Sequence, residues 1–520
     1  LPPALIQKAE ADRLSLSPRL RGTKLDEWID EWIVNNLDFK QRLSQGEYLA
    51  SRFRKGKLAL GAGIISELFK VKNKVFPNQL ALDEWLNDQN FDEGTREKIS
   101  QAVPPTKQVA EDVVLALDLN SGTVLWKTSL DSVPTGRKSS STPCLANGKI
   151  FAVGSKRIYC LDSKSGSPVW DEPLLTQEVA SSIIAVRQSV VVLAGNLRAY
   201  NQVDGTLLWE NNTVKGKAAS PVIWKNKVFT TTSNEKNGDQ YVQCNDVANG
   251  SVIWKKKFQS EHYPHHKFNS FASATPCVDK DLLITSWTTK ESNDLLCLGH
   301  DGTLKWRRDF GNFLTQHGSG FSPILHQDKV IVTYDHEGDS ALLALDRETG
   351  KTLWKTKRVG SKPSSSTPCI YNPPTGNTQV ICNSMSHGCY GVDIENGKVL
   401  WETGLGSLDK RSVSSPVQSG GFFFATCGAG TRGSRLIAVK PPASPRKIIS
   451  PTYTLTRNVP YVPTPLAADK LIFLLADSGI ASCMERHTGK IFWRERLKGN
   501  FFASPIIIND VIVIVSRMGE

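Results

Sequence analysis

An eleven-residue pattern that ends on tryptophan recurs along this 520-residue chain and constrains its fold more than any other feature. One copy reads ALDRETGKTLW, residues 344–354, and the copies end at Trp126, Trp170, Trp209, Trp254, Trp306, Trp354, Trp401 and Trp493. Successive tryptophans are 39 to 52 residues apart, except for one gap of 92 residues. A recurring period in this range indicates a repeat architecture.

Each copy has the composition of a tight turn between two strands. The glycine follows Ser, Thr, Asn or Asp, where such a turn requires a positive φ. An aspartate lies four residues before the glycine in several copies and can accept hydrogen bonds from the turn amides; these are Asp118, Asp162, Asp346 and Asp393. The tryptophan, four residues after the glycine, offers a large apolar face to a neighbouring unit.

A second signal precedes each copy: Ser/Thr-Pro or Ala-Ser-Pro, followed by two alternating apolar runs, as in SSTPCLANGKIFAVG and FASPIIINDVIVIV. Each unit is therefore predicted to hold four short antiparallel strands. Four-stranded units repeated around a ring form a β-propeller, which protects its strand edges. A solenoid of β-repeats is the alternative architecture.

The pattern Asp-x-x-[Ser/Thr/Asn]-Gly-x-x-x-Trp resembles the tryptophan-docking motif of the PQQ-like (pyrroloquinoline-quinone-type) β-propellers. That superfamily includes quinoprotein alcohol dehydrogenases and the BamB-type outer-membrane assembly lipoprotein. The stretches LTRNVPYVPTPL and GNFFASPI resemble the repeat proteins of planctomycete-type bacteria. The resemblance implies a mainly β fold for residues 109–520, and a periplasmic or otherwise extracytoplasmic location.

The number of blades depends on how the ends of this region are treated. Eight units run from Pro143 to Trp493, one of them a degenerate copy without tryptophan at 436–449. Strand pairs at 112–130 and 503–516 are left over and would join into a ninth, composite blade. Since the resemblance implies seven or eight blades, we expect an eight-bladed propeller of four-stranded antiparallel blades, within a range of seven to nine.

Residues 1–108 are expected to form a separate α-helical region that ends in a linker, AVPPTKQ. Apolar residues recur at helical spacing in 25–37, 44–70 and 80–103, and no family is recognised for this region. The run at 54–65 is too short to span a membrane and fits an amphipathic helix. No segment of the sequence is long and apolar enough for a transmembrane helix.

The sequence carries no recognisable catalytic or metal site. Quinoprotein dehydrogenases use a catalytic aspartate, a calcium ion held by Glu and Asn, and commonly adjacent cysteines, and none of these could be assigned here. The ten scattered cysteines fit buried free thiols. His262, His265 and His266 fit solvated loop residues, and the glycine-rich 427–434 fits a hairpin rather than a phosphate loop.

Cations precede nearly every predicted innermost strand. With the histidine of the remaining Pro-marked connection, they are Lys138, Lys217, Lys267, His317, Lys362, Arg411, Arg457 and Lys498. The net charge is +12, and residues 1–105 hold 16 Lys/Arg against 15 Asp/Glu, so the excess lies in the repeat region. If these side chains converge at the channel mouth, they focus a positive potential there; a generic basic surface is the alternative.

These observations predict a non-catalytic scaffold for protein interaction or assembly, without cofactor or metal. Its partner is expected to be a protein, and the mouth cations favour an anionic one such as an acidic segment, a polyanion or a carboxylated small molecule. Nucleic acid is not favoured, because no aromatic platform accompanies the cations. A PQQ-dependent quinoprotein oxidoreductase with calcium is the alternative function. The oligomeric state is left open.

Overall fold

The computed structural model divides the chain into two compact units, Leu1–Val109 and Ala110–Glu520. It describes the following residues: 2–16, 22–54, 74, 76, 79–89, 91, 96, 99, 110–133, 140–176, 179–216, 219–260, 270–289, 291–313, 320, 322–336, 338–359, 364–429 and 432–518.

The first unit is helical where it is described. Its helices are α1 (Pro3–Ser15), α2 (Thr23–Asn36), α3 (Phe39–Arg54) and α5 (Gln79–Asp88). Ile29, Trp32 and Phe53 form the centre of an apolar core between α2 and α3, because α2 repeats its apolar residues at helical spacing. Most of the predicted 54–65 helix lies outside the described residues. No described helix has the length and apolar character needed to cross a membrane.

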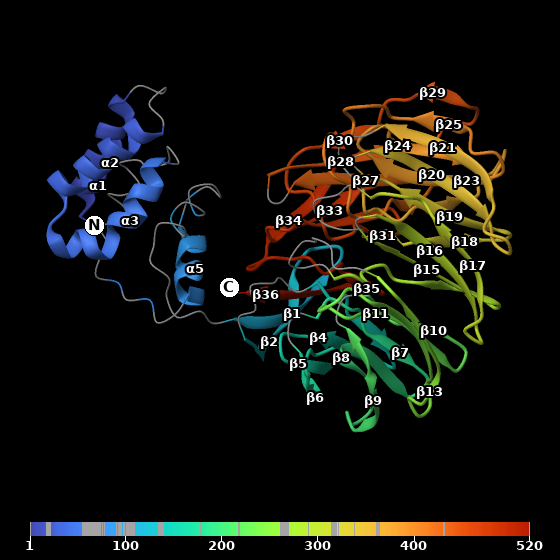
Figure 1. Cartoon of the computed structure of the whole chain (residues 1–520). Coiled ribbons are helices and arrows are strands. Elements are labelled where there is room, and N and C mark those ends of the chain that lie inside the picture. The colour runs from blue at the N-terminus through green and yellow to red at the C-terminus, as the bar shows by residue number, and fades with distance from the viewer. Residues whose placement is uncertain are drawn as a thin grey trace. The chain divides into compact units, whose positions relative to one another are not determined.

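The second unit is a β-propeller of nine sheets, whose blades we number in chain order (Figure 1). Blades 1 to 3 are β3 (Cys144–Ala146), β4 (Lys149–Val153), β5 (Arg157–Asp162) and β6 (Pro168–Pro173); β7 (Ile184–Val186), β8 (Ser189–Asn201) and β9 (Leu207–Gly216); and β10 (Val222–Trp224), β11 (Lys227–Ser233), β12 (Gln240–Asp246) and β13 (Val252–Phe258). Blades 4 to 6 are β14 (Cys277–Val278), β15 (Leu282–Thr288), β16 (Asn293–Gly299) and β17 (Leu304–Asp309); β18 (Ile324–His326), β19 (Lys329–Tyr334), β20 (Asp339–Asp346) and β21 (Thr352–Val359); and β22 (Cys369–Tyr371), β23 (Gln379–Ser384), β24 (Gly388–Asp393) and β25 (Val399–Glu402). Blades 7 to 9 are β26 (Val417–Ser419), β27 (Phe422–Ala429), β28 (Arg432–Val439) and β30 (Tyr453–Leu455); β31 (Leu466–Ala468), β32 (Leu471–Leu475), β33 (Ile480–Glu485) and β34 (Ile491–Arg496); and β35 (Ile506–Ile508), β36 (Val511–Met518), β1 (Glu111–Asp118) and β2 (Val124–Asp131).

The propeller has nine blades, one more than the eight expected and at the upper end of the range of seven to nine, because the leftover strand pairs join into one sheet of their own. That sheet has the order β2-β1-β36-β35, with β1 and β36 antiparallel from Glu111↔Met518 to Asp118↔Val511. This composite blade 9 closes the ring and hides two strand edges that would otherwise be open.

Two blades depart from the regular pattern. In blade 2 the long strand β8 doubles back at Gly195, which has a φ of 83°, and a backbone hydrogen bond from Gln202 to Gln188 joins its two arms. In blade 7 the first residues of the predicted degenerate copy, 436–439, belong to β28, and the later ones leave the sheet. Strand β29 (Arg446–Ile448) pairs in parallel with β25 of blade 6, and β30 becomes the fourth strand.

The motif tryptophans lie between blades, and all except Trp401 lie against the turn of the blade that follows. The indole of Trp354 donates to the Ile394 carbonyl at 2.8 Å and packs on Gly397. Equivalent bonds are Trp170 to Gln202, Trp209 to Val247, Trp254 to His300, Trp306 to Arg347 and Trp493 to Leu119, while Trp126 packs on Gly166. Trp401 instead donates to the Gln379 side chain of its own blade. Tyr453 takes the tryptophan's place in blade 7: its hydroxyl donates to the Arg486 carbonyl at 2.7 Å and its ring covers Gly489.

Each motif glycine serves both its turn and this packing. Gly350, for example, has a φ of 68°, and a Cβ at this position would lie 2.6 Å from the Trp306 ring. The aspartates of the same turns accept from the backbone N–H groups of Ser121, Ser165, Thr349 and Glu395 at 2.7 to 2.8 Å. Hydrogen bonds from Ser121, Ser165 and Thr349 hold the pKa values of Asp118, Asp162 and Asp346 below the usual range.

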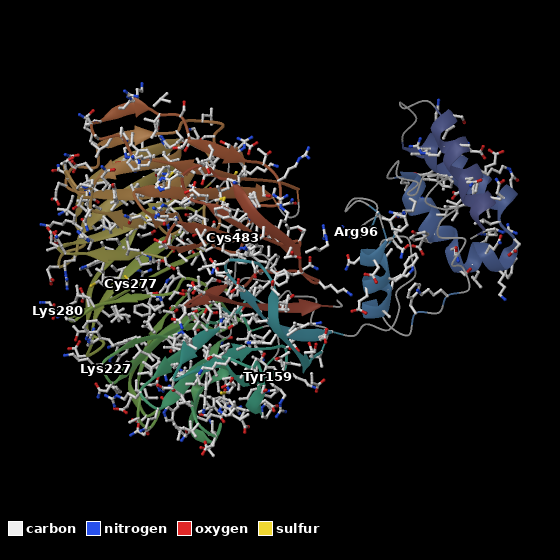
Figure 2. The ribbon with its side chains drawn as sticks, turned by 180° about the vertical axis from the view of Figure 1, so that it is seen from behind. Arg96, Tyr159, Lys227, Cys277, Lys280 and Cys483 are labelled. Carbon is white, nitrogen blue, oxygen red and sulfur yellow. The ribbon has the colours of Figure 1, made fainter. Side chains whose placement is uncertain are left out.

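The core consists of apolar layers between successive blades. Between blades 5 and 6, Ile331 and Leu342 meet Val380 and Tyr390 around Trp354, which is 8% exposed. All ten cysteines are free thiols, and Figure 2 marks Cys277 and Cys483 within the propeller. Burial raises the pKa of the Cys160 and Cys244 thiols to about 12, so these cysteines are small core residues rather than nucleophiles.

Candidate functional site

One face of the propeller carries all connections from the outermost strand of a blade to the innermost strand of the next. In a four-stranded antiparallel blade, strand 2 ends and strand 3 begins on that same face. We call it the connection face. The predicted mouth cations belong to these connections, and so do the Ser/Thr-Pro segments.

Only part of the predicted cation set lies in the described residues. Lys138, Lys217, Lys267, His317 and Lys362 lie outside them, as do the loop histidines His262, His265 and His266. The structure places the other three on successive connections: Arg411 before β26, Arg457 before β31 and Lys498 before β35. These three cations therefore share the connection face of blades 7 to 9.

The three described cations differ in their surroundings. Arg457 and Lys498 are exposed, whereas Arg411 is half-buried and its backbone carbonyl accepts from Gly428 at 2.9 Å. Burial raises the pKa of the neighbouring Tyr461 hydroxyl, and the positive charge of Arg411 opposes that rise. The side chains of Arg457 and Lys498 thus both reach solvent on this face.

The Ser/Thr residues of these connections bind neighbouring blades together. The backbone N–H of Ser182 donates to Ser220 at 2.9 Å, and that of Thr464 donates to Ser504 at 3.1 Å. Ser141 donates its hydroxyl to the Ser181 carbonyl at 2.8 Å. The Ser/Thr-Pro signal, which predicted only the start of an inner strand, thus also marks a hydrogen bond between blades.

A buried ion pair that the sequence did not reveal lies on the connection face between blades 5 and 6. Arg358, at the end of β21, contacts the carboxylate of Asp335 at 2.9 Å, and both side chains are almost fully buried. Arg358 also donates to the Asn383 carbonyl of blade 6 at 3.2 Å and lies 5.0 Å from the ring centre of Tyr390. Burial raises the pKa of Asp335 to about 6, although the charge of Arg358 opposes the rise.

The polar groups around this pair are incompletely satisfied. Among the described residues, Nε and Nη1 of Arg358 and both side-chain atoms of Asn383 find no hydrogen-bond partner. The only sequence signal was a cation four residues after Trp354, at a position whose side chain faces the next blade.

The described residues of this face do not fit a quinone held by calcium. Calcium requires six to eight oxygen ligands, usually with several carboxylates. Asp335 is already paired with the Arg358 guanidinium, which would repel a cation. Among the described residues, no three His, Cys, Asp or Glu side chains come together in a way that could hold a metal ion.

Comparison with known proteins places this architecture among its relatives. The family model described as outer membrane protein assembly factor BamB matches residues 110–236 and 238–495. The crystal structure of BamB from Moraxella catarrhalis is similar over 65% of this chain and 94% of its own, at 14% identity and a TM-score of 0.46. Quinohemoprotein alcohol dehydrogenase from Comamonas testosteroni is similar over 76% of this chain and 70% of its own, at 14% identity and a TM-score of 0.47. A europium-containing methanol dehydrogenase is similar over 72% of this chain and 81% of its own, at 14% identity and a TM-score of 0.47. A search of curated proteins gives no match.

Proposed function

Because the chain belongs to the family of the outer membrane protein assembly factor BamB, we propose that it is a non-catalytic scaffold for protein interaction or assembly. The family description names an outer-membrane assembly factor, and on this basis we place the protein outside the cytoplasm, with other proteins as its partners. We propose that this scaffold works without a cofactor.

The observation that carries this proposal is the use that the fold makes of its recurrent residues. The motif tryptophans, glycines and aspartates are engaged in contacts between blades and within turns, and the Ser/Thr groups of the connections join neighbouring blades. These residues build a rigid ring rather than a reaction centre. Partner binding then falls to side chains that the ring displays.

We further propose that the connection face binds an anionic partner through its exposed cations. Arg457 and Lys498 lie on neighbouring connections, and both side chains are exposed. Exposed charges of one sign attract an opposite charge, and salt screens that attraction over about 8 Å at physiological ionic strength. Binding should therefore weaken as salt is added.

The test is affinity capture of partners from envelope extract of the source cells, with the wild-type protein and two double variants. Arg457→Glu with Lys498→Glu should lose the partner at an unchanged melting temperature. Lys164→Glu with Lys351→Glu makes the same charge change in exposed turns of the opposite face and should keep it. Equal loss in both variants would rule out a connection-face site.

The alternative function, a PQQ-dependent oxidoreductase, is tested by direct addition of PQQ and Ca²⁺. We expect no quinone absorbance on the purified protein and no dye-linked oxidation of alcohols or sugars. Turnover that a chelator abolishes would overturn the scaffold proposal.

A further inference from the structure

The outermost strands of blades 3, 4 and 5 carry an unusual density of exposed cations. We call this surface the basic rim: Lys255, Lys256 and Lys257 of β13, Lys305 and Arg307 of β17, and Lys355 and Lys357 of β21. The one carboxylate on these three strands is Asp309. Three of the other outer strands are acidic: β6, β9 and β25 carry Asp171, Glu172, Glu210 and Glu402 against one lysine, Lys215. Strand β2 carries one charge of each sign, β30 carries none, and β34 carries Arg494 and Arg496 against Glu495. The charge is therefore unevenly distributed around the ring.

The alternation of side chains along these strands places the rim cations in the grooves between blades. The residue two positions after the docking aromatic faces the next blade: Thr356 donates to the Gly397 carbonyl at 2.5 Å and Asn211 to Gly250 at 2.8 Å. Lys256 occupies this position in blade 3 and therefore faces blade 4. Lys305 and Arg307 alternate with the docking tryptophan of blade 4 and so face back toward blade 3.

Most of the rim charge is not neutralised within the described chain. Lys257 pairs with Asp239 at 2.7 Å and Arg307 with Asp294 at 2.6 Å. No described carboxylate lies within 4 Å of Lys256, Lys305, Lys355 or Lys357. Like charges on neighbouring strands repel one another, so an anionic chain laid across them is favoured.

The same three strands also offer free backbone hydrogen-bonding groups. Strands β13, β17 and β21 are each the last strand of their sheet. Such an edge presents unpaired N–H and C=O groups to which an extended segment can add.

Blade 6 shows that an outer edge of this propeller accepts such a segment. There β29 lies beside β25 in parallel (Figure 1), and Ile449 donates its N–H to the Glu402 carbonyl at 2.9 Å. The added segment carries Arg446 and Lys447, and the strand that receives it carries Glu402. A basic segment thus covers an acidic edge. By the same charge complementarity, the basic edges of blades 3 to 5 favour an acidic segment.

We propose that the basic rim docks an extended acidic segment of a partner protein, which adds as a strand to the edge of an outer strand in blades 3 to 5. This rests on the proposed scaffold function and assigns it a second surface, distinct from the connection face. Backbone pairing would supply affinity, and the lysines would select carboxylate side chains.

The experiment uses the full chain and a labelled twelve-residue probe peptide of alternating Glu with Val or Thr. Two probes are compared by fluorescence anisotropy: the plain peptide, and the same peptide with six consecutive backbone amides methylated. The second probe keeps its charge but cannot pair as a strand over those residues. We expect the plain peptide to bind, with affinity falling as salt rises, and the methylated peptide to bind about tenfold or more weakly.

Charge reversal locates the site. Lys256→Glu, Lys305→Glu and Lys355→Glu together should weaken the plain peptide about tenfold or more. Lys490→Glu, Arg494→Glu and Arg496→Glu make the same charge change on the exposed outer region of blade 8 and should stay within about twofold of wild type.

Three results would overturn the proposal. If the plain peptide does not bind, the lysines serve only to keep edges from aggregating. If the methylated peptide binds equally well, the surface is a polyanion site without strand addition. If both triple variants weaken binding alike, the attraction is net charge alone. None of these results bears on the quinone test. Turnover with PQQ and Ca²⁺ in that test would refute the scaffold function and leave the peptide result intact.

Discussion

Replacing a motif glycine by alanine measures how much the contact between tryptophan and turn contributes to the ring. Gly397 has a φ of 74°, and a Cβ on it would lie 2.6 Å from Cε3 and 2.7 Å from Cδ2 of Trp354. Gly397→Ala therefore incurs two costs. An L-residue in the left-handed region costs about 1–2 kcal/mol, and overpacking a tight interior costs about 1–3 kcal/mol.

A second glycine separates the two costs. Gly148 has a φ of 71°, but a Cβ on it would meet nothing within 4 Å. Gly148→Ala should therefore lose only the backbone cost of about 1–2 kcal/mol, against about 2–5 kcal/mol for Gly397→Ala. Urea unfolding followed by far-UV circular dichroism gives both values on the same scale.

A double-mutant cycle completes the test. Trp354→Ala alone should cost about 3–5 kcal/mol, because it removes a large buried aromatic side chain. In that background the indole ring is gone and the nearest remaining atom is Oγ1 of Thr356, 3.0 Å from that Cβ. Gly397→Ala should therefore cost little more than Gly148→Ala. Equal effects of the two glycine variants in the wild-type background would refute the docking role of the glycine. An unchanged unfolding midpoint in Trp354→Ala would refute the docking role of the tryptophan.

Further predictions concern blades 5 to 7. Tyr453→Phe should lower the free energy of unfolding by about 1 kcal/mol, since it leaves the Arg486 carbonyl without its donor. Ile448→Ala should lower it by less than about 0.5 kcal/mol, because Ile448 is 60% exposed. Denaturant midpoints test both variants, and equal losses would contradict the view that Tyr453 takes the place of the docking tryptophan. Because the pKa of Asp335 is raised to about 6 in the folded protein, its stabilising contribution is complete at acidic pH and is lost as the pH rises through 6. Arg358→Met removes the opposing charge and raises that pKa further. The difference in free energy of unfolding between wild type and this variant should therefore grow by up to about 1.4 kcal/mol per pH unit above pH 6. A difference that stays constant from pH 5 to pH 8 would contradict this.

The repeating parts of the fold could be predicted because their information is local. Turn glycine, capping aspartate and docking tryptophan lie within eleven residues of one another, so each copy specifies its own hairpin. The N-terminal helices α2, α3 and α5 were likewise evident from apolar spacing. The described residues on either side of the Gly-rich turn also pair as expected of a hairpin, with Ala429 of β27 opposite Arg432 of β28.

What the sequence did not specify depends on contacts between distant segments. The composite ninth blade was drawn from the leftover strand pairs but not adopted, because the resemblance implied seven or eight blades. The pairing of β1 with β36, at the opposite end of the domain, decides the count. The degenerate copy was placed at 436–449, but Tyr453 supplies the aromatic ring of this blade. Tyr453 lies 15 residues after its partner Ala438, whereas Trp126 lies ten residues after its partner Ala116, so the regular spacing does not lead to it. The Asp335–Arg358 pair arises only when the loop after β19 and the end of β21 come together against the next blade, and no local pattern encodes that meeting.

The composite blade 9 has a mechanical consequence. Glu111 and Met518 are partners at the same end of the β1–β36 pair, so a force applied between them pulls the two strands apart from that end. The hydrogen bonds would then be loaded one after another, as in a zipper, rather than all at once as in shear. This joint therefore yields more easily to a load that enters through residue 111 and leaves through residue 518 than to a load that slides β1 and β36 along one another.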